Sequence, residues 1–330
     1  MFPRLIVLLL AVMAFAVPAR AEKTLRVTLQ LSLKNIIGQN LLEFKKIVEA
    51  ESKGDLKIQI YPSAQLFKDK DVPSAVASGV VEMGVAAVPR FAGTRPAVEL
   101  FYLPFLFRDN AAIARAVAPG APIRKILDQE MLSTGARPLW WQAYGMSVML
   151  GRREALTSPE VLKGRKTRVF GKMLGEFIRF AGGAPVLISG SEQFLAYQRG
   201  TVDFGMTGVP SAKSRRLYEV MPYLTVTNHA ALEFVVLIND RYWREELNDK
   251  ERQIITAAAR RAEASLRTRY ARIHRETLEW LDKNTPMKVV YLTPEQRKAW
   301  QKAAEPVYAL YVRNTGDVGR RLLAEARKLQ

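Results

Sequence analysis

Apolar residues in the N-terminal part of the chain recur with two different periods, and each period predicts one kind of element. Residues 25–31 (LRVTLQL) predict a buried strand, and residues 56–61 (LKIQIY) alternate between apolar and polar as a half-buried strand does. Between them, apolar positions at helical spacing predict a helix over about residues 37–48. A helix over residues 71–78 and a strand over residues 80–88 follow. This alternation predicts a parallel sheet covered by helices.

The next region repeats the rhythm. Residues 137–150 are mostly apolar and aromatic. They precede a predicted strand over residues 166–170, helices over 173–180 and 192–198, and a strand over 202–206. Two such units predict an α/β fold with two lobes, the build expected of a cleft-forming binding protein. Each lobe would hold a mixed or parallel sheet flanked by helices, with a ligand at the carboxyl ends of the strands.

Residues 248–283 predict one long helix, because apolar residues recur along a single face. A helix of this length is typical of a rigid connection between domains, so we interpret it as a strut that spans the hinge between two lobes. Its other face carries arginines, which either stay solvated or contact an anionic membrane: Arg260, Arg261, Arg267, Arg269, Arg272 and Arg275. After this helix, Pro286, Pro294 and Pro306 are expected to divide the tail into short pieces.

The first residues predict an export signal. Residues 5–17 form an apolar run of 13 residues after Arg4, and Ala19-Arg20-Ala21 fits a signal-peptidase site. A membrane-spanning helix needs about 20 apolar residues, so an uncleaved anchor is the lesser alternative. Cleavage near Ala21 would send the protein to the periplasm and leave 309 residues (330 minus 21). That length predicts two lobes, the first over residues 22–145 plus about 236–275, the second over 146–235 plus about 276–330.

Composition narrows the choice of partner. The formal net charge is +18, which favours anionic partners such as small acids, anionic lipid or nucleic acid. Export argues against nucleic acid, and a charge that serves only solubility stays open as an alternative. The chain has no cysteine, so its cores form without disulfides.

The sequence offers little support for catalysis. Its two histidines, His229 and His274, are far apart, and we expect His274 to be solvated on the long helix. Without cysteine they do not predict a metal site. We find no phosphate-binding loop, dinucleotide fingerprint or nucleophile elbow. We therefore expect a protein without cofactor that is not an enzyme.

The most informative stretch is residues 162–206, which contains LKGRKTRVF and then GGAPVLISGSEQFLAYQRGTVDFG. Its pattern resembles the solute-binding proteins of tripartite ATP-independent periplasmic (TRAP) transporters. The matching positions are Lys163, Gly164, Lys166 and Arg168, then Gly183, Ala184 and Pro185, then Glu192, Ala196, Gly200 and Asp203. Weaker matches to the family pattern at residues 62–66, 78–83 and 103–109 extend the resemblance over most of the mature chain.

The resemblance implies that Arg168 pairs with the carboxylate of a ligand. A guanidinium presents two parallel donors that match the two carboxylate oxygens, and its neighbours Thr167, Val169 and Phe170 are largely apolar. From the residues alone, an internal salt bridge with Asp203 or Glu192 is the alternative.

The sequence departs from the family pattern in two places. Thr207 stands where many relatives have an asparagine that reaches the ligand, and its hydroxyl can still donate one hydrogen bond. Relatives that bind sialic-acid-like sugars carry a second arginine in the preceding strand. Residues 140–146 contain none, which makes such a ligand less favoured.

Four further residues are candidates for the ligand cleft. Phe170 shares a strand face with Arg168. Trp141 and Tyr144 offer flat apolar surface with a polar edge, although core packing is the alternative for the tryptophan. Gln65 could add a polar contact.

These observations predict a monomeric periplasmic solute-binding protein that captures a small organic acid by closure of two lobes. The resemblance implies delivery to TRAP-type membrane permease subunits. One arginine in an aromatic setting suits a monocarboxylate somewhat better than a dicarboxylate, and the ligand itself stays open. A binding protein of an ATP-driven importer and a secreted hydrolase are the alternatives.

Overall fold

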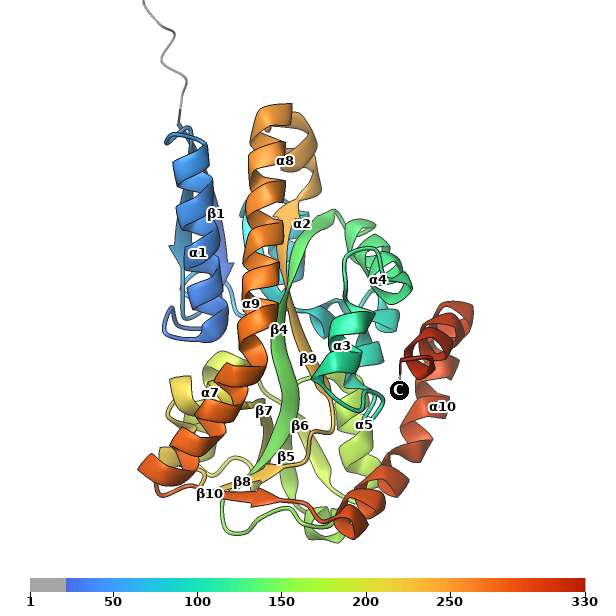
Figure 1. Cartoon of the computed structure of the whole chain (residues 1–330). Coiled ribbons are helices and arrows are strands. Elements are labelled where there is room, and N and C mark those ends of the chain that lie inside the picture. Colours follow the sequence, from blue (N-terminus) through green and yellow to red (C-terminus); the bar gives the residue numbers. More distant parts are fainter. Residues whose placement is uncertain (1–21, 330) are drawn as a thin grey trace, which may run out of the picture.

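The structure is a computed structural model that describes residues 22–329, so the predicted export signal lies outside the described residues. Within the described part, no helix combines the length and the apolar character needed to cross a bilayer. In the same range, ten strands and the helices around them form a mixed α/β fold, as predicted (Figure 1).

The first sheet has the strand order β2-β1-β3-β9-β4. Strands β2, β1 and β3 are parallel, whereas β9 runs antiparallel to both of its neighbours. The bounds are β1 (Lys23–Leu29), β2 (Leu56–Tyr61), β3 (Met83–Ala87), β4 (Ala136–Gly151) and β9 (Ala231–Asn239). The alternating run at residues 56–61 is confirmed as β2.

The second sheet is built on the other half of β4. Strand β7 pairs with β4, followed in order by β5 and β6, while β8 pairs with β4 and with β10. The bounds are β5 (Lys166–Val169), β6 (Ala184–Leu187), β7 (Phe204–Gly208), β8 (Tyr223–Val226) and β10 (Lys288–Tyr291). The pairing of β4 with β9 ends at Met146 and its pairing with β7 begins at Ser147, so one continuous strand belongs to both sheets.

Helices cover both sheets. Helix α1 (Ile36–Glu51) buries Ile37, Leu41, Phe44 and Val48, which lie on the apolar face that the sequence predicts. The other helices within residues 22–245 are α2 (Val72–Ala77), α3 (Asn110–Ala116), α4 (Pro122–Leu132), α5 (Lys172–Phe180), α6 (Gln193–Gln198), α7 (Val209–Ser214) and α8 (Asp240–Glu245). Short 3-10 helices are η1 (Val88–Phe91), η2 (Pro96–Tyr102), η3 (Pro159–Leu162), η4 (Gly190–Glu192) and η5 (Leu217–Glu219).

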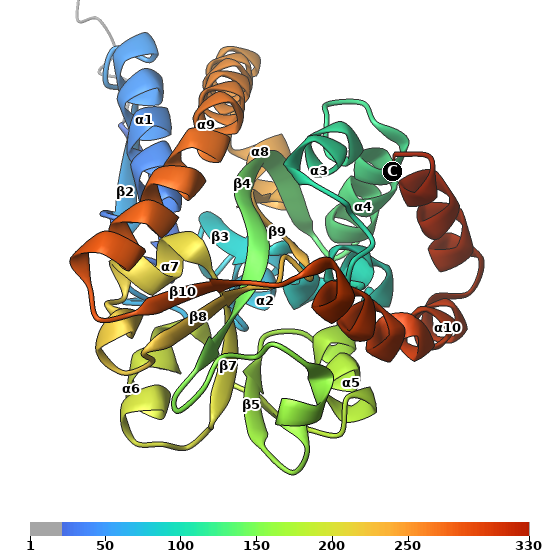
Figure 2. The same ribbon diagram turned by 60° about the horizontal axis from the view of Figure 1, so that its bottom comes forward.

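The predicted long helix is confirmed as α9 (Asp249–Asn284), which begins with a capping box between Asn248 and Glu251. It packs against α1 and β4 first and then against α7 and β10, so it reaches from one sheet to the other (Figures 1 and 2). Its basic face is not simply solvated. Arg261 pairs with Glu51, Arg269 with Glu43, and Arg267 with the buried Glu233.

The prediction that prolines divide the tail is confirmed at Pro286 and Pro294, which flank the short strand β10, and is wrong at Pro306. Two helical segments that meet at Gly316, whose backbone is not helical, make up α10 (Pro294–Arg327), with Pro294 in the first turn and Pro306 inside the first segment. The buried residues Trp300, Ala304, Val307 and Tyr311 recur at helical spacing, and their packing against η2, α4 and α5 outweighs the hydrogen bond lost at the proline.

Candidate functional site

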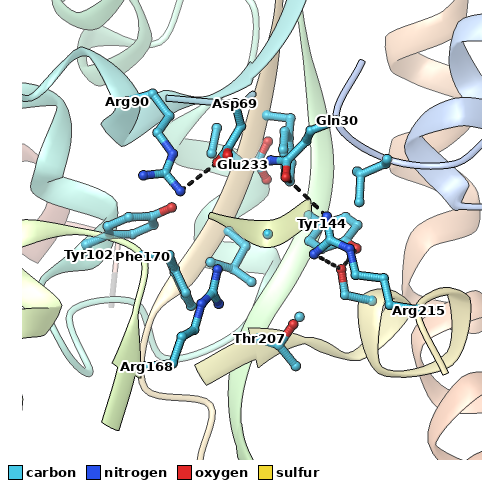
Figure 3. Close-up of a pocket in the computed structure, with 17 residues that line it drawn as sticks. Gln30, Asp69, Arg90, Tyr102, Tyr144, Arg168, Phe170, Thr207, Arg215 and Glu233 are labelled. Atoms are coloured by element: carbon cyan, nitrogen blue, oxygen red, sulfur yellow. Dashed lines mark hydrogen bonds and ion pairs between the residues drawn. The ribbon is translucent and has the colours of Figure 1, made fainter. Parts of the chain in front are cut away.

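A cavity of about 50 Å³ lies where the two sheets meet (Figure 3). Gln30, just beyond β1, contributes from the first sheet, while Arg168 in β5 and Thr207 in β7 contribute from the second. Arg215 follows α7, the helix that begins directly after β7. The site therefore forms at the carboxyl ends of strands, the place where open α/β sheets bind ligands.

Arg168 is 3 % exposed and has no carboxylate partner among the described residues. Its Nε donates to the carbonyl oxygen of Ile188 at 3.0 Å, and its Nη1 donates to the carbonyl oxygen of Met206. The structure does not show the alternative salt bridge. Asp203 instead accepts from the backbone N–H of Lys166, and Glu192 pairs with Lys68.

Burial lowers the pKa of the Arg168 guanidinium to about 10, because desolvation penalises the charged form and the nearby Arg215 and Arg90 repel it. The group still carries its charge at neutral pH. It lies over the ring of Phe170, with its Cζ 5.0 Å from the ring centroid, which gives a cation–π contact. A buried cation held only by neutral groups is unfavourable until an anion joins it.

Arg215 is a second, partly buried guanidinium in the same cavity, and the sequence analysis missed it. Its Nη1 donates to Gln193 Oε1 at 3.2 Å and to Ser211 Oγ at 3.3 Å, and its Nη2 donates to Gln30 Oε1 at 3.1 Å. All three partners are neutral, and burial lowers the pKa of Arg215 as well. Its spacing of four residues from Ser211, just after the strand at 202–206, is the signal that could have revealed it.

The other charged groups of the cavity are already paired, and the sequence analysis missed these too. Arg90 Nη2 lies 2.6 Å from Asp69 Oδ2. Both oxygens of Glu233 accept from Arg267 of α9, at 2.7 and 3.0 Å. Asp69 and Glu233 are each paired with another arginine. Among the described residues that line the cavity, Arg168 and Arg215 are therefore the two charged groups without a charged partner.

Four of the six residues proposed from the sequence line the cavity: Tyr144, Arg168, Phe170 and Thr207. The Tyr144 hydroxyl accepts from Asn35 Nδ2 at 3.0 Å and lies 2.7 Å from Ser211 Oγ. The Thr207 hydroxyl lies 3.4 Å from Gln193 Oε1. Their contact with a ligand stays a prediction.

Trp141 and Gln65 do not reach the cavity. Trp141 is fully buried, and its Nε1 donates to Asp128 Oδ1 of α4 at 2.8 Å, because its position on β4 turns it toward that helix. Gln65 is exposed in the loop after β2, where the backbone of Ser63 and Ala64 has positive φ. That sharp turn directs the following residue to solvent.

Several contacts hold the two sides of the cavity together. Lys68 Nζ lies 2.7 Å from Glu192 Oε1, and Asn35 Nδ2 donates to Ser214 Oγ at 2.9 Å. The buried Glu99 of η2 accepts from the backbone N–H of Lys172 at the start of α5, at 2.5 Å. Its burial raises the pKa of this carboxyl to about 7. The rim of the cavity is thus bridged by side chains from both sheets.

The histidines lie outside this cavity. His229 is fully buried, with Nδ1 2.6 Å from Thr227 Oγ1, and burial lowers its pKa to about 3. The expectation of a solvated His274 was wrong, since it is partly buried beside Tyr270 and desolvation lowers its pKa to about 4. Within residues 22–329, no group of three His, Asp or Glu side chains could hold a metal ion.

Comparison with curated proteins finds relatives over most of the chain. It is 29% identical over 276 residues to the C4-dicarboxylate-binding periplasmic protein DctP of Shewanella loihica, covering 83% of this chain and 81% of the relative. It is 27% identical over 301 residues to DctP of Rhodobacter capsulatus, covering 90% and 89%.

Solved structures share the fold. A TRAP periplasmic solute-binding protein from Shewanella oneidensis with bound succinate superposes with a TM-score of 0.88 at 24% identity, covering 94% of this chain and 99% of that one. The sugar-acid-binding protein DctPAm from Advenella mimigardefordensis, in complex with galactonate, gives 0.89 at 22%, covering 94% and 99%. These likenesses confirm the predicted two-lobed architecture.

The family model described as bacterial extracellular solute-binding protein, family 7, matches residues 29–314. The resemblance to TRAP solute-binding proteins that the motif at residues 162–206 indicated is thereby confirmed. The chain belongs to family 7 of the bacterial extracellular solute-binding proteins.

Proposed function

We propose that this protein captures a small organic anion with two negative charges in the periplasm and delivers it to TRAP-type membrane permease subunits. The observation that carries the proposal is the pair of guanidinium groups in the cavity, the buried Arg168 and the partly buried Arg215, whose hydrogen bonds all go to neutral partners among the described residues. The relatives from Shewanella loihica and Rhodobacter capsulatus, which are named as binding C4-dicarboxylates, support the same ligand class.

The unused donors of Arg168 suit a carboxylate. Its Nε and one N–H of Nη1 are engaged by carbonyl oxygens, which leaves the second N–H of Nη1 and both of Nη2. Two of these lie side by side at the end of the fork, so a carboxylate can accept from both nitrogens at once. Lysine would supply the charge without this orientation.

Arg215 changes the expected ligand from one charge to two. Burial is the main reason that the pKa of Arg168 is lowered, and repulsion by Arg215 lowers it further, so Arg168 costs more to keep charged because Arg215 is present. A dianion relieves both desolvation and repulsion, whereas a monoanion leaves one cation unmatched. The sequence alone, with one recognised arginine, favoured a monocarboxylate.

Capture would proceed by closure of two lobes without covalent chemistry. We propose the division suggested by the sequence, residues 22–145 plus about 236–275 against 146–235 plus about 276–330. The chain passes between the two sheets within β4, in the link from β8 to β9, and along α9. The position of both histidines outside the cavity disfavours a hydrolase, and the family match disfavours an ATP-driven importer.

The test uses the chain from residue 22 and a panel of ligands: succinate, propionate, glucose and putrescine. A ligand that binds only the folded state raises the melting temperature by mass action. We expect succinate to do so, and titration calorimetry should show that Arg168→Ala and Arg168→Lys bind at least about a hundredfold more weakly, given the roughly 3 kcal/mol lost when a charged pair is broken.

Arg165→Lys is the matched control, because Arg165 precedes the same strand, has a side chain that is 40 % exposed, and lies 3.7 Å from Glu154 outside the cavity. It should keep wild-type affinity. A panel in which glucose or putrescine binds and no carboxylate does would refute the proposed function.

A further inference from the structure

A buried carboxylate reaches across the boundary between the two lobes proposed above. Glu99 belongs to η2 in the first lobe and is 2 % exposed. Its Oε1 accepts from the backbone N–H groups of Lys172 and Met173, at 2.5 and 3.2 Å, and both residues belong to the first turn of α5 in the second lobe. One carboxylate oxygen thus satisfies two donors at a helix N-terminus, where the positive end of the helix dipole favours a negative charge.

The two lobes approach each other closely beside this carboxylate. A Cβ atom on Gly171 would fall 2.2 Å from Tyr102 Cδ2 and 3.2 Å from Glu99 Oε1, although the backbone of Gly171 is extended and any residue could adopt it. Tyr102 also meets Phe170 edge-on, with the ring centroids 5.1 Å apart (Figure 3). The lack of a side chain at Gly171 therefore allows η2 to contact the turn between β5 and α5.

Glu99 lines a second cavity, of about 540 Å³, that follows this boundary. Lys70 and Ala92 border it from the first lobe, and Gly175 and the exposed Leu187 border it from the second. Separation of the lobes would break both hydrogen bonds of Glu99 and would let water reach its carboxylate through this space. Closure removes that water and replaces it with two N–H donors.

Burial changes the protonation of Glu99 in the closed arrangement. Loss of hydration raises the pKa of its carboxyl to about 7, although the two N–H donors and the charges of Lys172 and Arg90 favour the ionised form. A carboxylate that faces water has a pKa near its ordinary value of 4.5. Between these two values, the closed protein therefore binds more protons than the open one, and a fall in pH favours closure.

The surroundings of Glu99 leave it as the group that closure affects most directly. The elements that pack against η2 are α10, η1, β9, α4 and α5. Their charged or titratable groups toward this region are Tyr311 of α10, Arg90 of η1, Glu233 of β9, Glu130 of α4 and Lys172 of α5. Glu233 is paired with Arg267 and Glu130 lies 3.6 Å from Arg95, so each of these acids has an arginine partner.

We propose that Glu99 couples closure of the lobes to the uptake of a proton, so that the protein binds its ligand more tightly as the pH falls from 7 to 5. In the open protein, water surrounds the carboxylate and it stays ionised in this range. In the closed protein, the carboxyl holds the proton and its Oε1 still accepts from the first turn of α5. The inference rests on the proposed capture of an anion by closure and adds regulation by pH to it.

The test follows succinate binding by titration calorimetry at pH 8, 7, 6 and 5. Succinate itself titrates in this range, so the quantity to compare is the dissociation constant of Glu99→Gln divided by that of the wild type, in which ionisation of the ligand cancels. Glutamine keeps the shape and one acceptor of Glu99 but does not titrate. The ratio should rise at least about fivefold, and at most about fiftyfold, from pH 7 to pH 5.

Proton uptake provides a second and direct measurement. Titrations at pH 6 in two buffers with different ionisation enthalpies give the number of protons bound for each succinate captured. The wild type should take up at least about half a proton more than Glu99→Gln. Fumarate, a stronger acid that keeps both charges to lower pH, gives the pH series on the wild type alone and needs no folded variant.

Glu176→Gln is the matched control. Glu176 lines the same cavity, but it pairs with Arg179 of its own helix and not across the boundary. This variant should keep the pH dependence and the proton uptake of the wild type. An equal loss of both in Glu176→Gln would assign the effect to the charge of the cavity as a whole and would overturn the role of Glu99.

The outcomes separate the two proposals. If the wild type and Glu99→Gln show the same pH dependence and the same proton uptake, Glu99 keeps one protonation state throughout, and the inference is overturned while anion capture stands. A ratio that falls on acidification also overturns it, because closure would then release a proton. If succinate binds at no pH, the proposed function fails and the inference fails with it.

Discussion

Gly145 of β4 lies directly against Tyr270 of α9, so close that a Cβ atom on Gly145 would fall 1.4 Å from the tyrosine Oη. Gly145 also has a φ of +88°, which side chains rarely adopt, and sits at an irregularity in the pairing of β4 with β9. It immediately precedes the point where β4 changes from one sheet to the other. The long helix is thus fitted against the bend of the shared strand.

We expect Gly145→Ala to destabilise the protein strongly. Gly54 provides a matched control, because it has the same φ of +88° but nothing lies within 4 Å of the place that a Cβ atom would take there. Gly54→Ala should cost about 1–2 kcal/mol for the backbone conformation alone. Gly145→Ala should cost at least about 2 kcal/mol more, because α9 must shift. Urea unfolding measures both, and equal losses would show that the contact with Tyr270 is easily relieved.

Arg215→Gln should weaken binding of dianions selectively. It removes one of the two unmatched charges, so succinate affinity should fall at least about tenfold, while propionate should change by less than about threefold. Arg216→Gln is the control next in sequence, since Arg216 is exposed and pairs with Glu219. Titration calorimetry at constant salt checks this, and a loss shared equally by both acids would mean that Arg215 acts through structure alone.

Glu99 should make stability fall as pH rises. Its folded-state pKa of about 7 lies above the ordinary value of 4.5, so the folded protein binds more protons between these values. The free energy of unfolding therefore decreases from pH 4.5 to 7, by up to about 3 kcal/mol. Glu99→Gln should remove this slope.

Urea unfolding at pH 5, 6 and 7 measures the slope, with Glu305→Gln on the exposed side of α10 as the control. His229 and His274 act in the opposite direction, because their lowered pKa values of about 3 and 4 make stability fall as pH drops below 6.5. For this reason the difference between wild type and Glu99→Gln is the quantity to follow. A difference that does not vary with pH would contradict the assignment.

The ion pair between Lys68 and Glu192 should have only a small effect on ligand affinity through closure of the two lobes. Both side chains are about half exposed, and such pairs are weak and sensitive to salt. Lys68→Glu should weaken ligand binding by no more than about fivefold at low salt, and the effect should vanish near 1 M salt. The charge-swapped double variant Lys68→Glu/Glu192→Lys should restore affinity. Failure of the swap to restore it would show that the pair does not act through charge.

Much of the fold could be predicted because local patterns dominate it. In β2, the apolar Leu56 and Ile58 are buried while Lys57 and Gln59 between and after them are more exposed. Helix α9 begins with a capping box and buries apolar residues at helical spacing. Helix α10 could not be predicted in the same way. Pro306 locally predicts a break, and only the packing of Trp300 and Tyr311 against other elements outweighs it.

The site residues show the same difference between what local patterns predict and what tertiary contacts decide. Arg168 and Phe170 share a strand face within one recognisable motif, so the sequence brings them together. Asp69, Arg90, Arg215 and Glu233 come from separate segments, and whether each is paired or free depends on tertiary contacts such as the one from Arg267. Trp141 was predicted to line the cavity but contacts α4 instead, because a run of aromatic residues does not indicate which face of β4 borders the cavity.

The position of β9 between β3 and β4 sets an order of assembly. Strands β3 and β4 precede β9 in the chain but do not pair with each other. Each of them pairs with β9 (residues 231–239), so neither gains this partner until β9 has been made. A nascent chain that stops before residue 231 therefore lacks the strand that joins β3 to β4, even if its helices have already formed. Such late, long-range closure slows folding. No single cut in the backbone would release either half as an intact unit, because segments of the two sheets alternate along the sequence.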